Sequence, residues 1–367
     1  MKEMFKQINK DANLVGASAI IIKDGKIVEE LNYGLGSIEK NTEVTSNTVF
    51  RIASVSKIIV ALGVMRLYEQ GKLDLDEDIS KYLGFKVRNP KFPDDIINLK
   101  MIMTQTSSII DGNYQEGGYD YFNGTNKKIT LKELLTVDSP YFYQGTFDIN
   151  KPGTTFIYSN FNCGILACII EKVSGVLFTK FIREEVLLPL DIDGSFKISD
   201  IKNTDVATLY SFLTGKIEIS RTREDFLKNE YEIFPLGENF RGPAGGLFIS
   251  MKDLSKIMNM LIYKGNQLFK EDTINLMLTK HWEGFSRIDS SYRAKGLQIQ
   301  ILDYFDNRRL YGHFGSAYGA KSYMLFNPEK NIGMCYITNG GGYIEQDNGF
   351  CDVHEKMINL FLNKYWS

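Results

Sequence analysis

Two residues one helical turn apart could form a nucleophilic pair. Ser54 and Lys57 begin a segment that is apolar on nearly every side and stops at Gly71. Positions three apart on a helix share one face, so the hydroxyl and the amine would lie close together. A serine hydroxyl needs a neighbouring base to become a nucleophile, and burial can leave a lysine unprotonated, and so able to accept that proton, by lowering its pKa. The spacing therefore indicates nucleophilic catalysis, with the backbone N–H of Ser54 as an oxyanion donor.

The same Ser–x–x–Lys spacing occurs twice more, at Ser37 with Lys40 and at Ser199 with Lys202. Neither pair begins a long apolar helix, so we predict that both lie in solvated turns. The spacing alone therefore does not single out Ser54, and further residues are needed.

Tyr158 and Asn160 form a second candidate motif, directly before another predicted helix. A tyrosine phenol beside a lysine can relay a proton, so Tyr158 could accept the Ser54 proton and later protonate the leaving group. The amide of Asn160 could orient Lys57 or a substrate amide, because it both donates and accepts hydrogen bonds. The structural alternative is a helix cap, since Ser and Asn are favoured there. A cap would explain the asparagine but not the tyrosine.

A third candidate motif, His313, Gly315 and Ser316, falls on a predicted strand near the C-terminus. Gly315 would let a ligand backbone approach closely. The backbone N–H of Ser316 could be a second oxyanion donor, and His313 would be a polar or cationic group at the rim. A single histidine is more often a structural residue than a functional one.

The three motifs together, in this order, resemble those of the serine β-lactamase and penicillin-binding protein superfamily. The likeness is greatest to its class C β-lactamase and D-alanyl-D-alanine peptidase branch, in which Tyr begins the second motif. Segments 49–57, 156–175 and 243–254 are similar to the family's own motif-bearing segments, and the likeness extends over roughly residues 15 to 365.

The resemblance implies an α/β (α+β) fold: an antiparallel sheet flanked by the N- and C-terminal helices, an all-α lobe, and the active site between them. It implies acylation of Ser54, a proton network of Lys57 and Tyr158, and an oxyanion hole from the backbone N–H groups of Ser54 and Ser316. Three further residues would contact the acyl part of the substrate: Asn160, His313 and Gly315. No metal or organic cofactor is implied.

The implied substrate is a small molecule or peptide: a D-amino-acid peptide, a β-lactam or a carboxylic ester. Two departures from the family pattern bear on this choice. Gln105 lies in a run, 103–109, that replaces the common His–Thr–Ser–Gly and lacks its glycine. Phe314 replaces a frequent threonine and removes a hydroxyl that often holds a substrate carboxylate. These departures keep an alternative open, a penicillin- or peptide-binding or sensing module on the same fold that does not hydrolyse.

Local patterns predict the elements that would position these residues. Asp24 and Gly25 predict a tight hairpin turn between strands at 17–23 and 26–33. Helices are expected at 54–70, 160–173 and 352–365, with a capping box opening another at Thr130. Strands are expected at 296–304, 308–314, 322–326 and 332–338. Residues 111–128, which include a second Tyr–x–Asn triplet at 121–123, have the composition of a surface loop.

These patterns place a discontinuous α/β sandwich lobe at 1–75 and 281–367 and a mainly helical lobe at 76–280. A formal charge of −2 provides no basic field for a polyanion, so nucleic acid is not expected as a partner. Four cysteines without a C–x–x–C pair are expected to be buried thiols, and no spacing suggests zinc.

No stretch is apolar for the ~18 residues that a membrane span needs, so no transmembrane segment is predicted. No hydrophobic signal-peptide core is visible at the N-terminus, which favours a cytoplasmic protein. A trimmed sequence would look the same, so an extracytoplasmic location stays open.

Overall fold

The computed structural model describes residues 1–367 except 214, 266–267, 287–291, 306, 347–349 and 367. In the described part of the chain, nine antiparallel strands form one sheet in the order β3-β2-β1-β13-β12-β11-β10-β9-β8. The strands of this sheet come from the two ends of the chain. The N-terminal part supplies β1 (Gly16–Lys23), β2 (Lys26–Ser37) and β3 (Thr42–Glu43). The C-terminal part supplies β8 (Trp282–Phe285), β9 (Tyr292–Lys295), β10 (Gln300–Phe305), β11 (Arg308–Ala317), β12 (Ala320–Asn327) and β13 (Ile332–Thr338).

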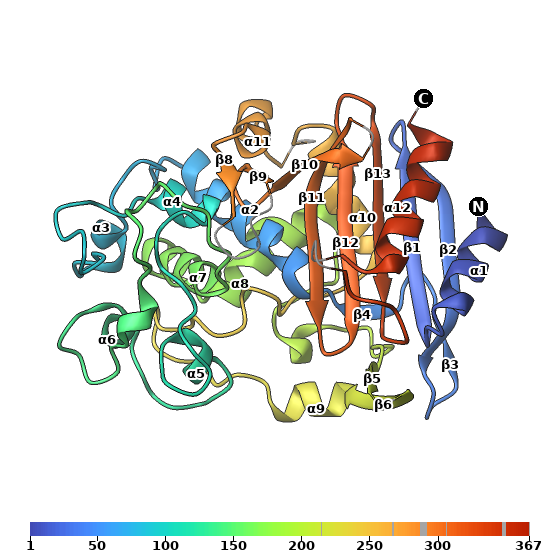
Figure 1. The fold of residues 1–367 in the computed structure, drawn as a ribbon, viewed down its shortest axis with the longest axis horizontal. Coiled ribbons are helices and arrows are strands. Elements are labelled where there is room, and N and C mark those ends of the chain that lie inside the picture. The colour runs from blue at the N-terminus through green and yellow to red at the C-terminus, as the bar shows by residue number, and fades with distance from the viewer. Residues whose placement is uncertain (214, 266–267, 287–291, 306, 347–349, 367) are drawn as a thin grey trace.

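The N- and C-terminal helices cover one face of this sheet, as Figure 1 shows. Helices α1 (Lys2–Asp11) and α12 (Asp352–Tyr365) pack against each other. Between them and the sheet lies an apolar core in which Phe5, Tyr323 and Phe361 are almost fully buried.

The other face of the sheet packs against α10 (Met251–Ile262), which contacts β1 and β13. Helix α2 (Ser56–Glu69) lies behind the sheet and packs against α7 (Phe161–Ser174). All but a few side chains of α2 are buried, because it lies between the sheet and the helical middle of the chain. The largest apolar core of the protein therefore surrounds the helix that begins next to Ser54.

The middle of the chain is mainly helical and lies to one side of the sheet in Figure 1. Its helices are α3 (Ile79–Leu83), α4 (Leu99–Thr104), α5 (Tyr119–Asn123), α6 (Leu131–Leu135), α8 (Phe178–Ile182), α9 (Arg223–Lys228) and α11 (Glu271–Leu278). Two short strand pairs complete the described elements: β4 (Val49–Arg51) with β7 (Phe248–Ser250), and β5 (Leu209–Leu213) with β6 (Lys216–Arg221).

Several sequence predictions are confirmed. Asp24 and Gly25 both have positive φ, 49° and 75°, and join β1 to β2 as the turn chemistry requires. The capping box at Thr130 is present, with hydrogen bonds in both directions. Helix α12 has the predicted bounds, and helices α2 and α7 agree with prediction to within two residues. All four cysteines are buried and free.

Other predictions need correction. The strand expected from residue 296 begins only at Gln300, because Gly296 to Ile299 form a turn closed by a backbone hydrogen bond of 3.0 Å. Segment 111–128 is not merely a surface loop: it contains α5, whose Tyr119 and Phe122 are buried. Strands β8 and β9, and the pairs β4–β7 and β5–β6, were not predicted, because short strands carry little periodicity.

The lobe boundaries remain a prediction, although α10, which falls within the expected helical lobe, packs on the sheet. Within the described residues, no helix is long and apolar enough to span a bilayer.

Candidate active site

Ser54 lies at a strained turn between strand β4 and helix α2. Ala53, directly before it, has φ 49°, a left-handed conformation that is costly for a residue with a side chain. Hydroxyls fix the turn on both sides: Ser322 donates to the Ile52 carbonyl at 2.8 Å, and Ser56 donates to the Ala53 carbonyl at 2.6 Å. The turn is therefore held in a single conformation by Ser322, which is distant in sequence, and by Ser56, the first residue of α2.

Lys57 is fully buried and lies one turn beyond Ser54 on the same helix face, as its spacing predicts. Its Nζ lies 3.0 Å from Ser54 Oγ, 2.9 Å from Asn160 Oδ1 and 2.9 Å from the carbonyl oxygen of Ala244. These three oxygen atoms match the three donors of an ammonium group. The amine is therefore held in a fixed position against the hydroxyl oxygen.

Asn160 lies at the start of α7, but its side chain does not cap that helix. Its amide bridges two charged groups instead: Oδ1 accepts from Lys57, and Nδ2 donates to Asp111 at 3.0 Å. The Asp111 carboxylate also accepts from the backbone N–H groups of Asn160 and Phe161, at 3.0 and 2.8 Å, and from the Ser159 hydroxyl at 2.8 Å. The cap of α7 is thus an aspartate from the loop segment, and Asn160 is free to hold the lysine.

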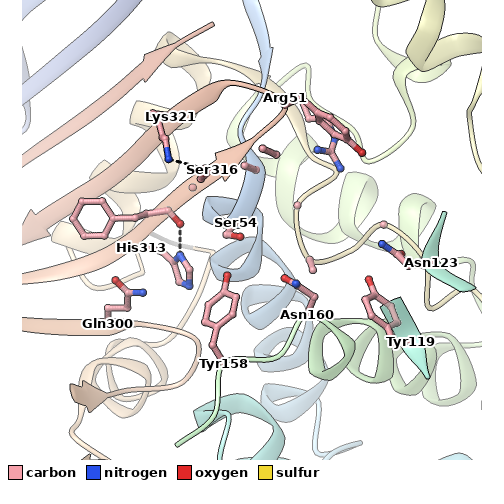
Figure 2. A pocket seen from close by; sticks show the side chains of 18 of the residues that line it. Arg51, Ser54, Tyr119, Asn123, Tyr158, Asn160, Gln300, His313, Ser316 and Lys321 are labelled. Atoms are coloured by element: carbon pink, nitrogen blue, oxygen red, sulfur yellow. Dashed lines mark hydrogen bonds between the residues drawn. The ribbon is translucent and has the colours of Figure 1, made fainter. Parts of the chain in front are cut away.

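Tyr158 lies beside Lys57 and is half-buried. The Lys57 ammonium lies 4.8 Å from the centre of the tyrosine ring. Figure 2 shows the Tyr158 hydroxyl pointing toward Ser54. The phenol, the amine and the serine hydroxyl therefore surround the same small volume.

His313 is not at the rim, as the sequence suggested, but is buried to 2% exposure. Its Nδ1 lies 2.6 Å from the Phe314 carbonyl oxygen, so Nδ1 carries the proton, and among the described residues Nε2 has no partner. Burial, together with the positive charges of Lys295 and Lys57, lowers the pKa of His313 well below its usual value. The ring is therefore neutral. Its Nε2 can accept a hydrogen bond, and His313 lines the same cavity as Ser54.

Position 315 must be glycine, because other parts of the chain lie too close for a side chain there. A Cβ at this position would lie 2.6 Å from the Ile52 carbonyl oxygen and 2.4 Å from Ser322 Oγ. Strand β11 can therefore approach the turn before Ser54 only if it carries glycine here. The next residue, Ser316, lines the site and accepts a hydrogen bond of 2.9 Å from Lys321.

Around one cavity of about 410 Å³, Figure 2 labels five of the predicted site residues: Ser54, Tyr158, Asn160, His313 and Ser316. Lys57 is buried beside Ser54, and Gly315 also lines this cavity. The sequence did not identify several other residues that line it: Arg51, Tyr119, Asn123, Tyr231, Gln300 and Lys321. Asn123 belongs to the second Tyr–x–Asn triplet, the only signal that could have pointed to it. Among the described lining residues there is no aspartate or glutamate.

In neither of the two further Ser–x–x–Lys pairs does the lysine amine contact the serine hydroxyl in the described structure; Lys40 reaches Ser37 Oγ only through its backbone N–H, at 3.2 Å. Ser37 donates to Glu39, while Lys40 pairs with Glu224. The Ser199 hydroxyl donates to Glu230 at 3.0 Å on the protein surface. The prediction that both pairs lie in solvated turns agrees with the exposure of Ser199 but is wrong for Ser37, which is 3% exposed at the end of β2.

Of the two departures from the family pattern, Phe314 is among the residues that line the cavity and Gln105 is not. The side chain of Gln105 donates to Gln298 at 3.1 Å. The ring of Phe314 packs edge-on to Phe350 at 4.3 Å, in the core beneath α12. Ser108, where the family run has glycine, adopts φ 64°, so the turn keeps its left-handed conformation at a cost of about 1 kcal/mol.

The arrangement provides a serine hydroxyl with a lysine amine in contact with it and a phenol that lines the same cavity. Such a set can transfer a proton from a serine during attack on a carbonyl carbon. Among the described residues, no group of three His, Cys, Asp or Glu side chains could hold a metal ion.

The family model described as Beta-lactamase matches residues 1–349, and the chain therefore belongs to the beta-lactamase family. Among curated proteins, it is similar to protein flp of Staphylococcus aureus (strain N315), with 26% identity over 330 residues, which are 89% of this chain and 60% of that protein. The chain thus spans 60% of the length of this relative.

Among solved structures, the fold is similar to the octameric penicillin-binding protein homologue from Pyrococcus abyssi, with a TM-score of 0.76 and 27% identity over 98% of this chain and 76% of that one. It is also similar to D-amino acid amidase from Ochrobactrum anthropi SV3, with a TM-score of 0.71 and 19% identity over 98% and 97% of the two chains. Family and fold together support a hydrolase of the β-lactamase and penicillin-binding protein type.

Proposed function

We propose that the protein is a serine hydrolase that forms an acyl-enzyme on Ser54. Its substrates are D-amino-acid peptides or amides, β-lactams or carboxylic esters. The observation that carries the proposal is the 3.0 Å contact between Lys57 Nζ and Ser54 Oγ in a cavity that Tyr158 also lines. Membership of the beta-lactamase family and the similarity in fold to a D-amino acid amidase support the same chemistry.

In the acylation step, Ser54 Oγ attacks the carbonyl carbon of the substrate, and its one proton passes to the unprotonated amine of Lys57, which reprotonates Tyr158 after the phenol has donated to the leaving group. The backbone N–H groups of Ser54 and Ser316 stabilise the negative oxygen of the tetrahedral intermediate. Tyr158 then donates a proton to the leaving nitrogen or oxygen as its bond to the carbonyl carbon breaks. The products of this step are the acyl-enzyme and a free amine or alcohol.

In the deacylation step, water attacks the ester carbon of the acyl-enzyme and passes a proton back to Ser54 through the same residues. The carboxylic acid is released, and the serine is restored. Asn160 holds Lys57 in place throughout. His313, whose ring centre lies 6.1 Å from that of Tyr158, faces the leaving-group side of the cavity in this proposal, rather than the acyl part that the family resemblance implies.

The test is covalent labelling by a fluorescent penicillin or a fluorophosphonate, followed by intact-mass analysis. We expect Ser54→Ala to abolish labelling and to lower turnover of reactive esters at least ~10⁴-fold, because a member of a catalytic unit is lost. Lys57→Met should cause a similar loss.

The matched control is Ser199→Ala, which removes an exposed serine with the same Ser–x–x–Lys spacing. It should label and turn over substrate like the wild type. Unchanged labelling of the Ser54→Ala variant would contradict the proposal.

The alternative, a binding or sensing module that does not hydrolyse, rested on Gln105 and Phe314. Neither side chain is directed at Ser54: the first pairs with Gln298, and the second packs beneath α12. We therefore favour hydrolysis, and Ser54-dependent turnover of D-Ala-D-Ala peptides or p-nitrophenyl esters would eliminate the alternative.

A further inference from the structure

The cationic groups of the cavity are not equally available to a ligand. Lys57 is held by three oxygen atoms, and Lys321 donates to Ser316 Oγ and to Glu345 at 2.5 Å. Arg51 also lines the cavity, but among the described residues its guanidinium has neither an ion-pair partner nor a hydrogen-bond acceptor. None of the described residues that line this cavity is acidic. Asp225, Glu230 and Glu232 line the second cavity that Arg51 also borders, but none of them forms an ion pair with its guanidinium in the described structure, so the donors of Arg51 are available to a ligand.

The position of Arg51 is fixed although its donors are free. Its backbone is paired with Phe248 in the β4–β7 ladder. Its guanidinium lies 5.0 Å from the centre of the Tyr318 ring and 5.9 Å from that of Phe226. Aromatic rings hold a guanidinium without occupying its N–H groups in the ring plane, so the planar donor fork stays available to a carboxylate.

The side of Ser54 on which Arg51 lies determines which part of a substrate it would meet. If Tyr158 protonates the leaving group, the leaving group must lie beside Tyr158. The acyl substituent of the attacked carbonyl carbon then points the opposite way. Figure 2 shows Arg51 and Tyr158 on opposite sides of Ser54, so the acyl substituent extends toward Arg51.

Beyond Arg51 there is room for a substituent of some size. A second cavity of about 320 Å³ adjoins the first and shares four lining residues with it: Arg51, Tyr231, Gly242 and Tyr318. Arg51 therefore lies at the boundary between the two cavities, where an acyl group would pass.

We propose that Arg51 is a specificity-determining residue that binds a carboxylate on the acyl portion of the substrate. This inference rests on the proposed acyl-enzyme function, and it narrows the substrate class to acyl groups that carry a negative charge. Guanidinium–carboxylate pairs form two parallel charge-assisted hydrogen bonds, so the preference should depend on the fork geometry as well as on charge.

The kinetic test compares two esters with the same leaving group and the same acyl chain length, 4-nitrophenyl hydrogen glutarate and 4-nitrophenyl pentanoate. We expect Arg51→Gln to lower kcat/KM for the glutarate ester about 10- to 100-fold more than for the pentanoate ester. The loss should lie mainly in KM, because the carboxylate is bound in both the ground state and the transition state. Arg51→Lys should restore only part of the preference.

The control for the loss of one exposed arginine is Arg309→Gln. Arg309 is exposed on β11, pairs with Asp303 and is not among the described residues that line either cavity. It should leave the ratio of the two esters unchanged. An equal loss for both esters in Arg51→Gln would overturn the inference while leaving the acyl-enzyme proposal intact.

A binding measurement keeps the inference testable even if neither ester is hydrolysed. Carbenicillin and benzylpenicillin differ by one carboxylate on the acyl side chain. Titration calorimetry with the Ser54→Ala variant should show tighter binding of carbenicillin, and adding Arg51→Gln should remove the difference. Equal affinities of the two penicillins for Ser54→Ala would contradict the role of Arg51. Turnover that survives in Ser54→Ala would instead contradict the proposed function.

Discussion

The three hydrogen bonds of Lys57 are compatible with both protonation states of its amine. An ammonium donates to all three oxygen atoms around it. A neutral amine keeps two N–H groups, which suffice for Asn160 and Ala244, and it turns its lone pair toward the Ser54 hydroxyl. Proton transfer therefore requires only that the serine bond reverse its direction, and no side chain has to move.

His313 provides a prediction at the residue scale. Because burial and the charges of Lys295 and Lys57 lower its pKa well below the usual value, we expect the ring to stay neutral throughout the pH range in which an exposed histidine titrates. The pH profile of kcat/KM should contain no ionisation from this residue in that range. NMR titration of histidine-labelled protein measures this directly, with His313→Gln as the assignment control. A His313 resonance that titrates with a midpoint above pH 6 would contradict the prediction.

At the scale of elements, the start of helix α7 depends on a residue from a different segment. Asp111 accepts four hydrogen bonds there, two of them from backbone N–H groups at the positive end of the helix dipole. The same carboxylate orients the Asn160 amide, whose oxygen holds Lys57. The stability of this helix end and the placement of Lys57 therefore depend on one carboxylate.

We accordingly predict that Asp111→Ala has two effects. It should lower the free energy of unfolding by about 2 kcal/mol, as the loss of a helix cap does. It should also lower kcat more than it raises KM, because Asn160 loses its orientation and Lys57 is less well held. Chemical denaturation and steady-state kinetics well below the unfolding temperature measure the two effects separately.

Asp94→Ala is the matched control for Asp111, since Asp94 is exposed and lies in a neighbouring loop. It should change neither quantity. If Asp111→Ala lost stability but kept its kcat, Asp111 would be a cap alone and not a positioning residue for Asn160.

At the scale of the whole molecule, the cavity forms where the sheet meets the helical middle of the chain. Strand β11 contributes His313 and Ser316, the turn before α2 contributes Ser54, and the segment before α7 contributes Tyr158. Helix α2 passes between these layers and is almost completely buried. The site is thus assembled from three segments that are held together by the largest core of the protein.

The buried lysine Lys295 makes the free energy of unfolding depend on pH. It is buried on β9, with its ammonium 4.5 Å from the centre of the Phe156 ring. Burial and the charges of Arg293 and Lys57 lower the pKa of Lys295 to about 7, against about 10.4 in an unfolded chain. Between these two values the unfolded chain binds a proton that the folded protein does not, so this lysine makes stability rise with pH.

We therefore predict that Lys295→Met stabilises the protein most below pH 7, where the folded protein must bury the charged form. The gain should be about 4 to 5 kcal/mol at pH 6 and should shrink as the pH approaches 10. Urea denaturation at several pH values measures this difference. Lys330→Met, which removes an exposed lysine from the β12–β13 turn, is the control for the loss of one positive charge. A gain that did not change with pH would show that the methionine acts through packing alone.

The amino-acid sequence by itself determined the features that depend on neighbours along the chain. The Ser54–Lys57 contact follows from helix geometry, because residues three apart share a face. The β1–β2 hairpin follows from Asp24 and Gly25, which adopt positive φ readily. The order of the three motifs was also enough to indicate the family.

Only the tertiary structure decided which distant groups complete the site. Sequence spacing does not predict that Asp111 caps α7. It also does not predict that Arg51 lies on the side of the cavity opposite Tyr158. Both distances are set by the packing of separate segments. Burial likewise made His313 a neutral ring, since a histidine's charge depends on its surroundings and not on its sequence neighbours. Local geometry is encoded within a few residues, whereas the electrostatics of a cavity arise only after the core has closed around it.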